Sequence, residues 1–326
     1  MRKGIHAMKF QYIAALFLLF PIITVSCNEK EDEPIKDNET YRILIVPDIQ
    51  NYTNDASRFH FLDGITDFYL DNCSKFNACF QVGDLTSRNY LEQYEASYQH
   101  FFSRFPEGEE PFFCLGNHDY GKNGGTQVRE SLMPSYIQPK VDFSMPGTVY
   151  DNYVRFLELG ETRYAVLVLE ICTRNEVIEW ANSVVEEYTE TPFIILTHIF
   201  TNKYGKIHDE SDTEVYHGGS QKSYSMGGVD YLNDSMEIFE KLIYNHQNIK
   251  MVICGHTFLP DYIEVTGKQN IVGKNVPVLT VNYQHYDYGG MGYVGILEFI
   301  GNDTYNVKSY STYEGKYGPI DITFGN

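Results

Sequence analysis

Short apolar runs bounded by turn-forming residues recur along most of this chain, and they constrain its fold more than any other feature. Runs of this length are typical of buried strands, and we expect strands at 41–47, 76–82, 111–115, 163–169, 192–197 and 249–254. Segments with helical periodicity lie between several of them, at 59–69, 90–105, 175–188 and 231–246. Strands that alternate with helices predict an α/β domain built around a largely buried sheet.

The C-terminal part of the chain has a different pattern. Strand-like runs at 276–283, 293–300 and 305–310 follow one another without a helix between them, so we expect one edge to be antiparallel. The polar, glycine-bearing stretch 202–228 predicts a long loop, and loops of that length are more often functional than idle. Its histidines, His208 and His217, either contact a substrate or are surface residues, and surface histidines are the commoner case.

Residues 1–26 have the features of a bacterial secretory signal peptide. Basic residues precede an apolar run at 10–25, which is shorter than the roughly 18 to 20 residues of a membrane-spanning helix. A small residue directly before Cys27 resembles a lipoprotein cleavage site, after which Cys27 would receive lipid and become the mature N-terminus. The alternative is an ordinary signal peptide with an incidental cysteine. Both interpretations predict a protein that leaves the cytoplasm.

The segment 27–40 after this cysteine is polar and rich in acidic residues, which predicts a disordered lipoprotein tether. The remaining residues, 41–326, are enough for one large domain with an ample core. We therefore expect a cell-envelope lipoprotein that contacts the membrane through its N-terminal lipid. The sequence leaves open whether it faces the periplasm or the cell surface.

The chain is strongly acidic, with 25 Lys and Arg residues against 44 Asp and Glu residues and a formal net charge of −19. Such a chain repels nucleic acid, so we expect no nucleic-acid partner. An acidic balance is compatible with binding divalent cations, although most of these carboxylates should lie at the solvated surface.

The cysteines outside the predicted signal carry little information about function. Cys114 and Cys254 lie inside apolar runs, which favours buried thiols. Cys73 and Cys79 are a candidate disulfide pair that the sequence alone leaves undecided.

Five short polar motifs each follow a predicted strand: Asp48-Ile49-Gln50, Gly83-Asp84, Gly116-Asn117-His118-Asp119, Thr197-His198 and Gly255-His256-Thr257-Phe258. Ligands of open α/β sheets bind outside the carboxyl ends of the strands, so these motifs should converge. Their carboxylate, amide and imidazole donors suit a divalent transition metal such as Mn, Fe or Zn. Singly, the aspartates could cap helices, the asparagine could satisfy a turn and the histidines could be core residues. Together the five favour a metal site.

The order of these motifs resembles that of the calcineurin-like metallophosphoesterases over about residues 41–258, and the G-N-H-D element between a G-D and a later G-H is the most specific part. The resemblance implies a four-layer α/β/β/α sandwich. It also implies two divalent metal ions, bridged by a carboxylate and a hydroxide that attacks phosphorus. The expected activity is metal-dependent hydrolysis of a small phosphomonoester or phosphodiester outside the cytoplasm.

The resemblance assigns a role to each motif residue. Asp84 would be the bridging carboxylate, and Asp48 a ligand of one metal. The other metal would be held by Asn117, His198 and His256 together with the bridge. His118 resembles the catalytic histidine of the family, which stabilises the phosphoryl group or protonates the leaving oxygen, and Asp119 would hold its imidazole in one tautomer.

Two departures from the family pattern fall on the metal nearest Asp48. Gln50 stands where the family usually has a histidine, and Phe258 replaces the second histidine of G-H-x-H. Gln50 can still offer its amide oxygen, whereas Phe258 offers no donor, so we expect the two sites to differ in affinity. The departures also leave an alternative: a noncatalytic or single-metal binding lipoprotein on the same fold. The intact His118 argues against it.

A late segment, Asn282-Tyr283-Gln284 followed by Gly289-Gly290-Met291-Gly292-Tyr293, resembles one found in secreted members of the family. Its pattern predicts a strand end and then a glycine-rich turn. The turn either lets the backbone approach another group closely or is an ordinary tight turn.

Overall fold

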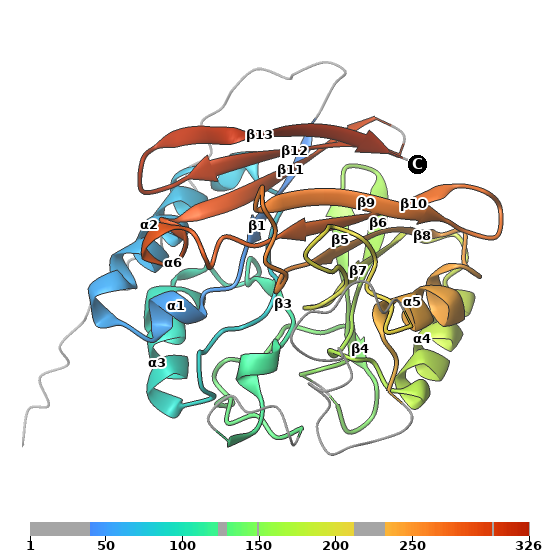
Figure 1. Ribbon diagram of the computed structural model, residues 1–326, viewed down its shortest axis with the longest axis horizontal. Helices are drawn as coiled ribbons and strands as arrows, with labels where there is room; N and C mark the ends of the chain where they lie inside the picture. The colour runs from blue at the N-terminus through green and yellow to red at the C-terminus, as the bar shows by residue number, and fades with distance from the viewer. Residues whose placement is uncertain (1–39, 123–128, 149, 212–231, 302, 326) are drawn as a thin grey trace, which may run out of the picture.

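The computed structural model describes residues 40–122, 129–148, 150–211, 232–301 and 303–325 (Figure 1). The predicted signal peptide, Cys27, most of the tether and His217 lie outside these ranges. In the part of the chain that is described, no helix has the length and apolar character needed to cross a membrane.

Two mixed β-sheets form the centre of the fold. The first has six strands in the order β13-β12-β11-β1-β2-β3, and the second has seven in the order β4-β5-β6-β7-β8-β10-β9. The first sheet comprises β1 (Tyr41–Val46), β2 (Ala78–Gln81), β3 (Phe112–Phe113), β11 (Tyr293–Gly301), β12 (Thr304–Ser311) and β13 (Lys316–Gly325). The second comprises β4 (Phe143–Ser144), β5 (Tyr153–Leu159), β6 (Thr162–Val168), β7 (Phe193–Leu196), β8 (Ile249–Cys254), β9 (Ile263–Gln269) and β10 (Asn275–Val281).

Helices cover the outer face of each sheet. On the first sheet lie α1 (Gln50–Thr53), α2 (Phe59–Asp71) and α3 (Leu91–His100), and on the second lie α4 (Asn175–Glu187) and α5 (Ser235–Ile238), which continues into the π-helical turn η7 (Phe239–Ile243). The short elements are η1 (Ala56–Arg58), η2 (Cys73–Lys75), η3 (Phe102–Arg104), η4 (Asn117–Asp119) and α6 (Asp287–Gly290). These layers confirm the predicted α/β/β/α sandwich.

The central strands are buried on both faces. In β1, Ile43 and Ile45 point into the core between the two sheets, whereas Leu44 and Val46 pack beneath α2 and its neighbours. All four side chains are fully buried. Successive side chains of a strand point to opposite faces, so a strand covered on both sides must be apolar at every position. This is why the central strands appear in the sequence as continuous apolar runs.

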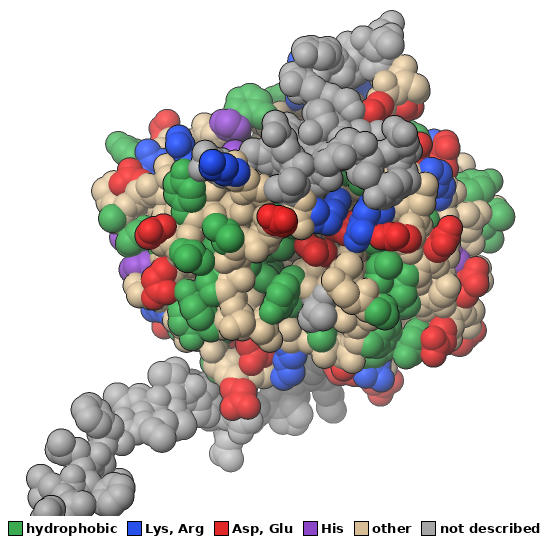
Figure 2. All heavy atoms as spheres, turned by 90° about the horizontal axis from the view of Figure 1, so that it is seen from below, with side chains coloured by type: hydrophobic (Ala, Val, Ile, Leu, Met, Phe, Trp, Pro, Cys, Tyr) green, Lys and Arg blue, Asp and Glu red, His purple; other side chains and the backbone are tan. Residues whose placement is uncertain are grey.

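Parallel pairing gives the fold its functional edge. The strands β1, β2 and β3 are parallel in one sheet, and β6, β7, β8 and β10 are parallel in the other. Their carboxyl ends lead into the loops in the lower half of Figure 1. Figure 2, which views the molecule from below, shows acidic side chains interspersed with basic and apolar ones on the visible part of this face.

The strands and helices predicted from apolar runs are present, with two differences. The structure adds β4, β5, β9 and β13, which pair antiparallel with their neighbours. The strands β9 and β13 lie at sheet edges and alternate between more and less exposed positions, so they contain no continuous apolar run. The helix predicted at 231–246 begins only at Ser235, where the Asp234 side chain caps it, and its second half is π-helical.

The C-terminal strands are antiparallel, as predicted, with one exception. The strands β11, β12 and β13 form the antiparallel edge of the first sheet. Strand β10 instead pairs parallel with β8 and antiparallel with β9. The end of β10 therefore lies beside the end of β8, and it brings the 282–284 segment to the same edge as His256. Cys79 has a free, buried thiol and so is not paired with Cys73.

Candidate metal centre

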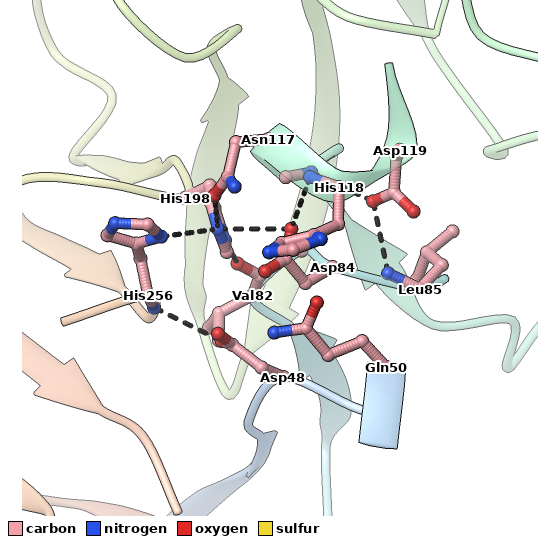
Figure 3. Close-up of polar contacts among 12 residues, drawn as sticks. Asp48, Gln50, Val82, Asp84, Leu85, Asn117, His118, Asp119, His198 and His256 are labelled. Atoms are coloured by element: carbon pink, nitrogen blue, oxygen red, sulfur yellow. Dashed lines mark hydrogen bonds and ion pairs between the residues drawn. The ribbon is translucent and has the colours of Figure 1, made fainter. Parts of the chain in front are cut away.

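The predicted site residues converge at the carboxyl ends of the parallel strands (Figure 3). Asp48 follows β1, Asp84 follows β2 and Asn117 follows β3, while His198 and His256 follow β7 and β8. The ligand atoms of Asp84, His198 and His256 all lie within 4.8 Å of one another. Both sheets therefore contribute donors to one point.

Four donor atoms surround a common centre near His198. Its Nε2 atom lies 3.1 Å from Asn117 Oδ1, 3.3 Å from Asp84 Oδ1 and 3.2 Å from His256 Nδ1. One N–H group cannot be directed at three acceptors at once. Ligands about 2.0–2.2 Å from a metal ion are separated by about 2.8–3.1 Å at octahedral angles and by about 3.3–3.6 Å at tetrahedral angles. The donor set therefore fits a single cation.

The orientation of the His198 ring is fixed from behind. Its Nδ1 atom donates to the carbonyl oxygen of Val82 at 2.7 Å, which leaves Nε2 as the atom that faces Asp84 and Asn117. Metal-binding histidines usually have such a partner on the second nitrogen, because it selects the tautomer with a free lone pair toward the metal.

A second group of donors lies beside the first. Within the described residues, the buried atoms Asp84 Oδ2 and Gln50 Oε1 have no hydrogen-bond partner. Leaving a buried polar atom unpaired costs about 1–3 kcal/mol, so such atoms call for an explanation. Figure 3 shows the Gln50 side chain extending from α1 toward Asp84 and His118. A cation held by Asp48, Gln50 and Asp84 would satisfy both atoms, so the residues present fit a two-metal centre.

The electrostatics of the cluster also favour a cation. Burial raises the pKa of Asp48 to about 7. Burial alone would raise the pKa of Asp84 and lower that of His198. The attraction between the two groups outweighs burial. Together with His118 it holds the Asp84 pKa well below its usual value, and together with Asp48 it raises the His198 pKa to about 9. Burial lowers the pKa of His256 to about 3, and the neighbouring His198 adds to this effect. In the protein alone, the proton on His198 thus balances the charge of the ionised Asp84, and a bound metal would displace that proton.

The backbone is strained at two of the predicted ligands. Asp84 has φ of 54° and His256 has φ of 60°, which are left-handed conformations that non-glycine residues adopt infrequently. Such residues concentrate at functional sites, where surrounding contacts hold them in place. Here the Asp84 Oδ1 atom accepts the His118 backbone N–H at 2.9 Å, and Asp48 Oδ1 accepts that of His256 at 3.1 Å.

The glycines of the motifs give the donors room to meet. A Cβ atom added to Gly116 would lie 2.1 Å from Asp84 Oδ1, and one added to Gly255 would lie 2.5 Å from Asp48 Oδ1. Neither separation is tolerable, because the atoms would overlap. The glycines before Asn117 and His256 are therefore steric requirements of the site.

Asp119 was expected to contact the His118 imidazole, but it does not. Its carboxylate accepts the backbone N–H groups of Gly116, Leu85 and Thr86 at 2.9–3.0 Å, because the 3₁₀ turn directs it back beneath the preceding loop. The His118 ring instead donates from Nδ1 to the Ser87 carbonyl oxygen at 2.8 Å. Asp119 thus ties the loop after β2 to the loop after β3, and burial raises its pKa to about 6.

The other expectations for individual residues have mixed outcomes. Asp48 is not a helix cap, since α1 has no side-chain cap, and its carboxylate faces the site. Phe258 is 57% exposed, and its ring packs edge-on against His285 with centroids 4.5 Å apart. His208 was expected more often at the surface but is buried, and its backbone N–H and carbonyl pair with Phe200 and Met236.

Two amide side chains at this site were missed in the motif analysis. Gln284 Nε2 donates to Asp48 Oδ2 at 3.0 Å, and Asn282 Nδ2 donates to the same oxygen at 3.4 Å. The sequence pattern singled out the segment 282–284 but did not indicate that these side chains lie at the site. The available signal was that they follow an apolar strand, β10, in the same way as the five motifs do.

Comparisons with known proteins agree with this geometry. The sequence profile of the calcineurin-like phosphoesterases matches residues 41–260. A search of curated proteins found no match. Among solved structures, a purple acid phosphatase from yellow lupin (Lupinus luteus) seeds aligns at 12% identity and a TM-score of 0.53, covering 88% of this chain and 54% of its own. This chain thus spans about half the length of that enzyme, and the likeness shows the fold alone.

Two further structures align at lower scores. GAP50, the anchor in the inner membrane complex of Plasmodium, covers 88% of this chain and 89% of its own, at 12% identity and a TM-score of 0.49. A predicted phosphoesterase from Streptococcus pneumoniae covers 88% of this chain and 98% of its own, at 10% identity and a TM-score of 0.36.

The close approach at Gly116 can be tested by adding one methyl group. We expect Gly116→Ala to displace Asp84 and to lower metal affinity by on the order of 10- to 100-fold, the usual effect of disturbing a ligand's support. Gly301→Ala is the control, because an added Cβ there meets no described atom within 4 Å. Elemental analysis after dialysis measures bound metal, and thermal unfolding reports whether each variant folds. Equal metal content in folded Gly116→Ala and Gly301→Ala would contradict the steric argument.

Proposed function

This chain belongs to the calcineurin-like phosphoesterase family, and on that premise we propose that it hydrolyses small phosphomonoesters or phosphodiesters outside the cytoplasm. Family membership makes it a metal-dependent phosphoesterase. The observation that carries the proposal for its site is the convergence of three donor atoms on His198 Nε2, next to two buried oxygens, on Asp84 and Gln50, that lack partners among the described residues.

The family normally binds a dinuclear metal centre, and the donor groups here divide into two sets. We assign Asn117, His198 and His256 to one metal, Asp48 and Gln50 to the other, and Asp84 to both. When bound, the metals neutralise the phosphoryl oxygens and lower the pKa of the attacking water. Oxygen donors dominate the second set, which favours a harder ion such as Mn there, whereas imidazoles in the first set accommodate Mn, Fe or Zn.

His118 is the residue we assign to proton transfer. Because a carbonyl oxygen can only accept, the bond to Ser87 keeps a proton on Nδ1 of the ring. The Nε2 atom is then the one available to a substrate, and in the imidazolium form of the ring, which carries a proton on both nitrogens, it can donate that proton to the leaving oxygen. The backbone N–H of His118 also donates to Asp84, so the ring stands on the same turn that supports the bridging carboxylate. Asp119 acts as a positioning residue, since it fixes this turn.

The N-terminal features complete the proposal. We propose that residues 1–26 are removed as a signal peptide, that Cys27 carries lipid, and that 27–40 tether a catalytic domain of residues 41–326 to the cell envelope. The strongly negative charge of the chain supports a small phosphoester substrate over a nucleic acid.

The alternative of a noncatalytic or single-metal lipoprotein has one point in its favour, namely that Phe258 supplies no donor. Two observations weigh against it. The oxygens Gln50 Oε1 and Asp84 Oδ2 are kept buried and unpaired among the described residues, which serves no purpose in a site for one metal. The ring of His118 is also held in one orientation, which a binding protein does not need.

Loss of a donor from the centre should remove both metal and activity. We expect Asp84→Ala and His256→Ala to abolish turnover and to lower bound metal, because no neighbouring side chain replaces either donor. The assay uses chromogenic phosphomonoesters and phosphodiesters, with Mn, Fe and Zn added singly, alongside elemental analysis. His246→Ala is the control, since this half-buried histidine contacts Asn182 in the outer helical layer. Unchanged metal in both site variants would refute the ligand assignment.

Removal of the His118 ring should separate chemistry from metal binding. We expect His118→Ala to retain metal but to lose on the order of 10²- to 10⁴-fold in kcat, the usual size of an acid–base contribution. The loss should be smaller for substrates with a good leaving group, since these need less protonation of the leaving oxygen. A variant as active as the wild type would exclude the catalytic role.

The lipid should determine location alone. We expect Cys27→Ala to yield active protein that is absent from the membrane fraction, because the lipid chain supplies the membrane affinity. Fractionation followed by the phosphatase assay measures both properties. Wild-type protein that is equally soluble would show that Cys27 is incidental.

A further inference from the structure

We propose that Gln284 is a positioning residue that turns the Gln50 amide so that its oxygen, rather than its nitrogen, faces the second metal position. This inference rests on the two-metal site proposed above. It concerns a residue outside the five motifs, at the end of β10, whose side chain lies between Asp48, Gln50 and the backbone of His256.

The hydrogen bonds of Gln284 identify which atom of its side-chain amide is the nitrogen and which is the oxygen. One atom of the amide lies 3.0 Å from Asp48 Oδ2 and 3.2 Å from the carbonyl oxygen of His256. Both partners are acceptors, so this atom must be the nitrogen. The Gln284 oxygen then faces Gln50 and accepts a hydrogen bond from its Nε2.

This bond sets the direction of the Gln50 amide in turn. With Nε2 turned toward Gln284, Oε1 is directed away from it and remains the buried atom without a partner among the described residues. The opposite orientation would set Gln50 Oε1 against the Gln284 amide oxygen, so that two acceptors would face each other without a proton between them. It would also turn the Gln50 N–H groups toward the side on which Asp84 lies, where an N–H group cannot bind a cation. Gln284 therefore keeps the amide nitrogen of Gln50 turned away from Asp84, which leaves the second metal position open.

The backbone around Gln284 is held firmly against the helix that carries Gln50. Asn51 Nδ2 donates to the Gln284 carbonyl oxygen at 2.7 Å, and the Gln284 N–H donates to Asn282 Oδ1 at 2.9 Å. The first link keeps the two glutamines in register, since Asn51 is the neighbour of Gln50 in α1, and the second fixes the backbone within the 282–284 segment.

The glycine-rich turn after Gln284 strengthens this attachment. The N–H of Gly292 donates to Tyr52 Oη at 3.0 Å, and an added Cβ on Gly290 would lie 2.4 Å from the same oxygen. Gly290 has φ of 126°, in the region that favours glycine. The turn thus does bring the backbone close to another group, and that group is α1. This gives a physical reason for finding the amide segment and the glycines together.

The test compares Mn²⁺ binding by purified wild-type protein and by Gln284→Leu, Gln50→Ala and the double variant, with free Mn²⁺ followed by electron paramagnetic resonance. We expect wild type to bind two ions with unequal affinity. Gln284→Leu and Gln50→Ala should each weaken the weaker site by about 10- to 100-fold and leave the tighter site unchanged. The double variant should be no weaker than Gln50→Ala, because Gln284 acts through Gln50.

Asn270→Leu is the control, since it removes a buried amide from the β9–β10 turn, outside the residues that line the centre. It should leave both Mn²⁺ affinities unchanged. The inference is overturned if Gln284→Leu changes neither site or both equally, if wild type binds a single ion, or if the double variant is weaker than Gln50→Ala. Because the readout is binding, the two proposals can fail separately: wild type that holds two ions without turnover would refute the proposed function, whereas the affinities of the variants decide the role of Gln284.

Discussion

A single buried imidazole nitrogen, His198 Nε2, is the point around which the loops of this protein are arranged. An aspartate oxygen, an asparagine oxygen and a second imidazole all lie within 3.3 Å of it. Such a cluster is unfavourable unless a positive charge stands at its centre, because burial removes the water that would otherwise solvate the carboxylates. The structure therefore has to supply enough stability elsewhere to hold these groups together before a metal arrives. The core of two stacked sheets, buried on both faces, provides it.

The sequence was sufficient to predict the centre of the fold and the convergence of the five motifs at one edge of the sheets, but not the presence of Asn282 and Gln284 beside them. Continuous apolar runs such as 249–254 can only be buried strands or helix cores, and the polar motif after each run indicates which end of the strand is functional. The edge strand β13 escaped prediction because its positions alternate in exposure and give no apolar run. Asp119 was misassigned for a different reason. Two of its partners are backbone N–H groups of a loop 33 and 34 residues away in the chain, and backbone donors leave no mark in a sequence.

The position of Gln284 could not be predicted from the sequence motifs. Its contacts with Gln50 and Asp48 join residues separated by more than 230 positions, and they arise because β10 pairs parallel with β8. The order of strands in the second sheet, in which β9 lies at the edge and β10 next to β8, cannot be read from periodicity. An antiparallel hairpin of β8 and β9 would have been the simpler expectation. Strand order thus decided which polar residues reach the centre.

The exchange of an imidazole for an amide at position 50 changes what the surrounding protein must do. An imidazole can ligate through either ring nitrogen, and one hydrogen bond to its other nitrogen selects the tautomer, as Val82 does for His198. An amide has one ligating atom and one atom that repels a cation, and the two ends are almost equal in size. Rotation of the Gln50 amide by half a turn would replace the ligating oxygen with an N–H group, which would compete with the metal for Asp84. A neutral amide ligand therefore needs an acceptor that holds its nitrogen away from the metal, and that acceptor must itself be fixed. The carboxylate of Asp48 and the carbonyl of His256 meet this need by holding the Gln284 amide. The glutamine at position 50 and the amide segment after β10 thus act together, because the segment holds the Gln50 oxygen toward the metal position.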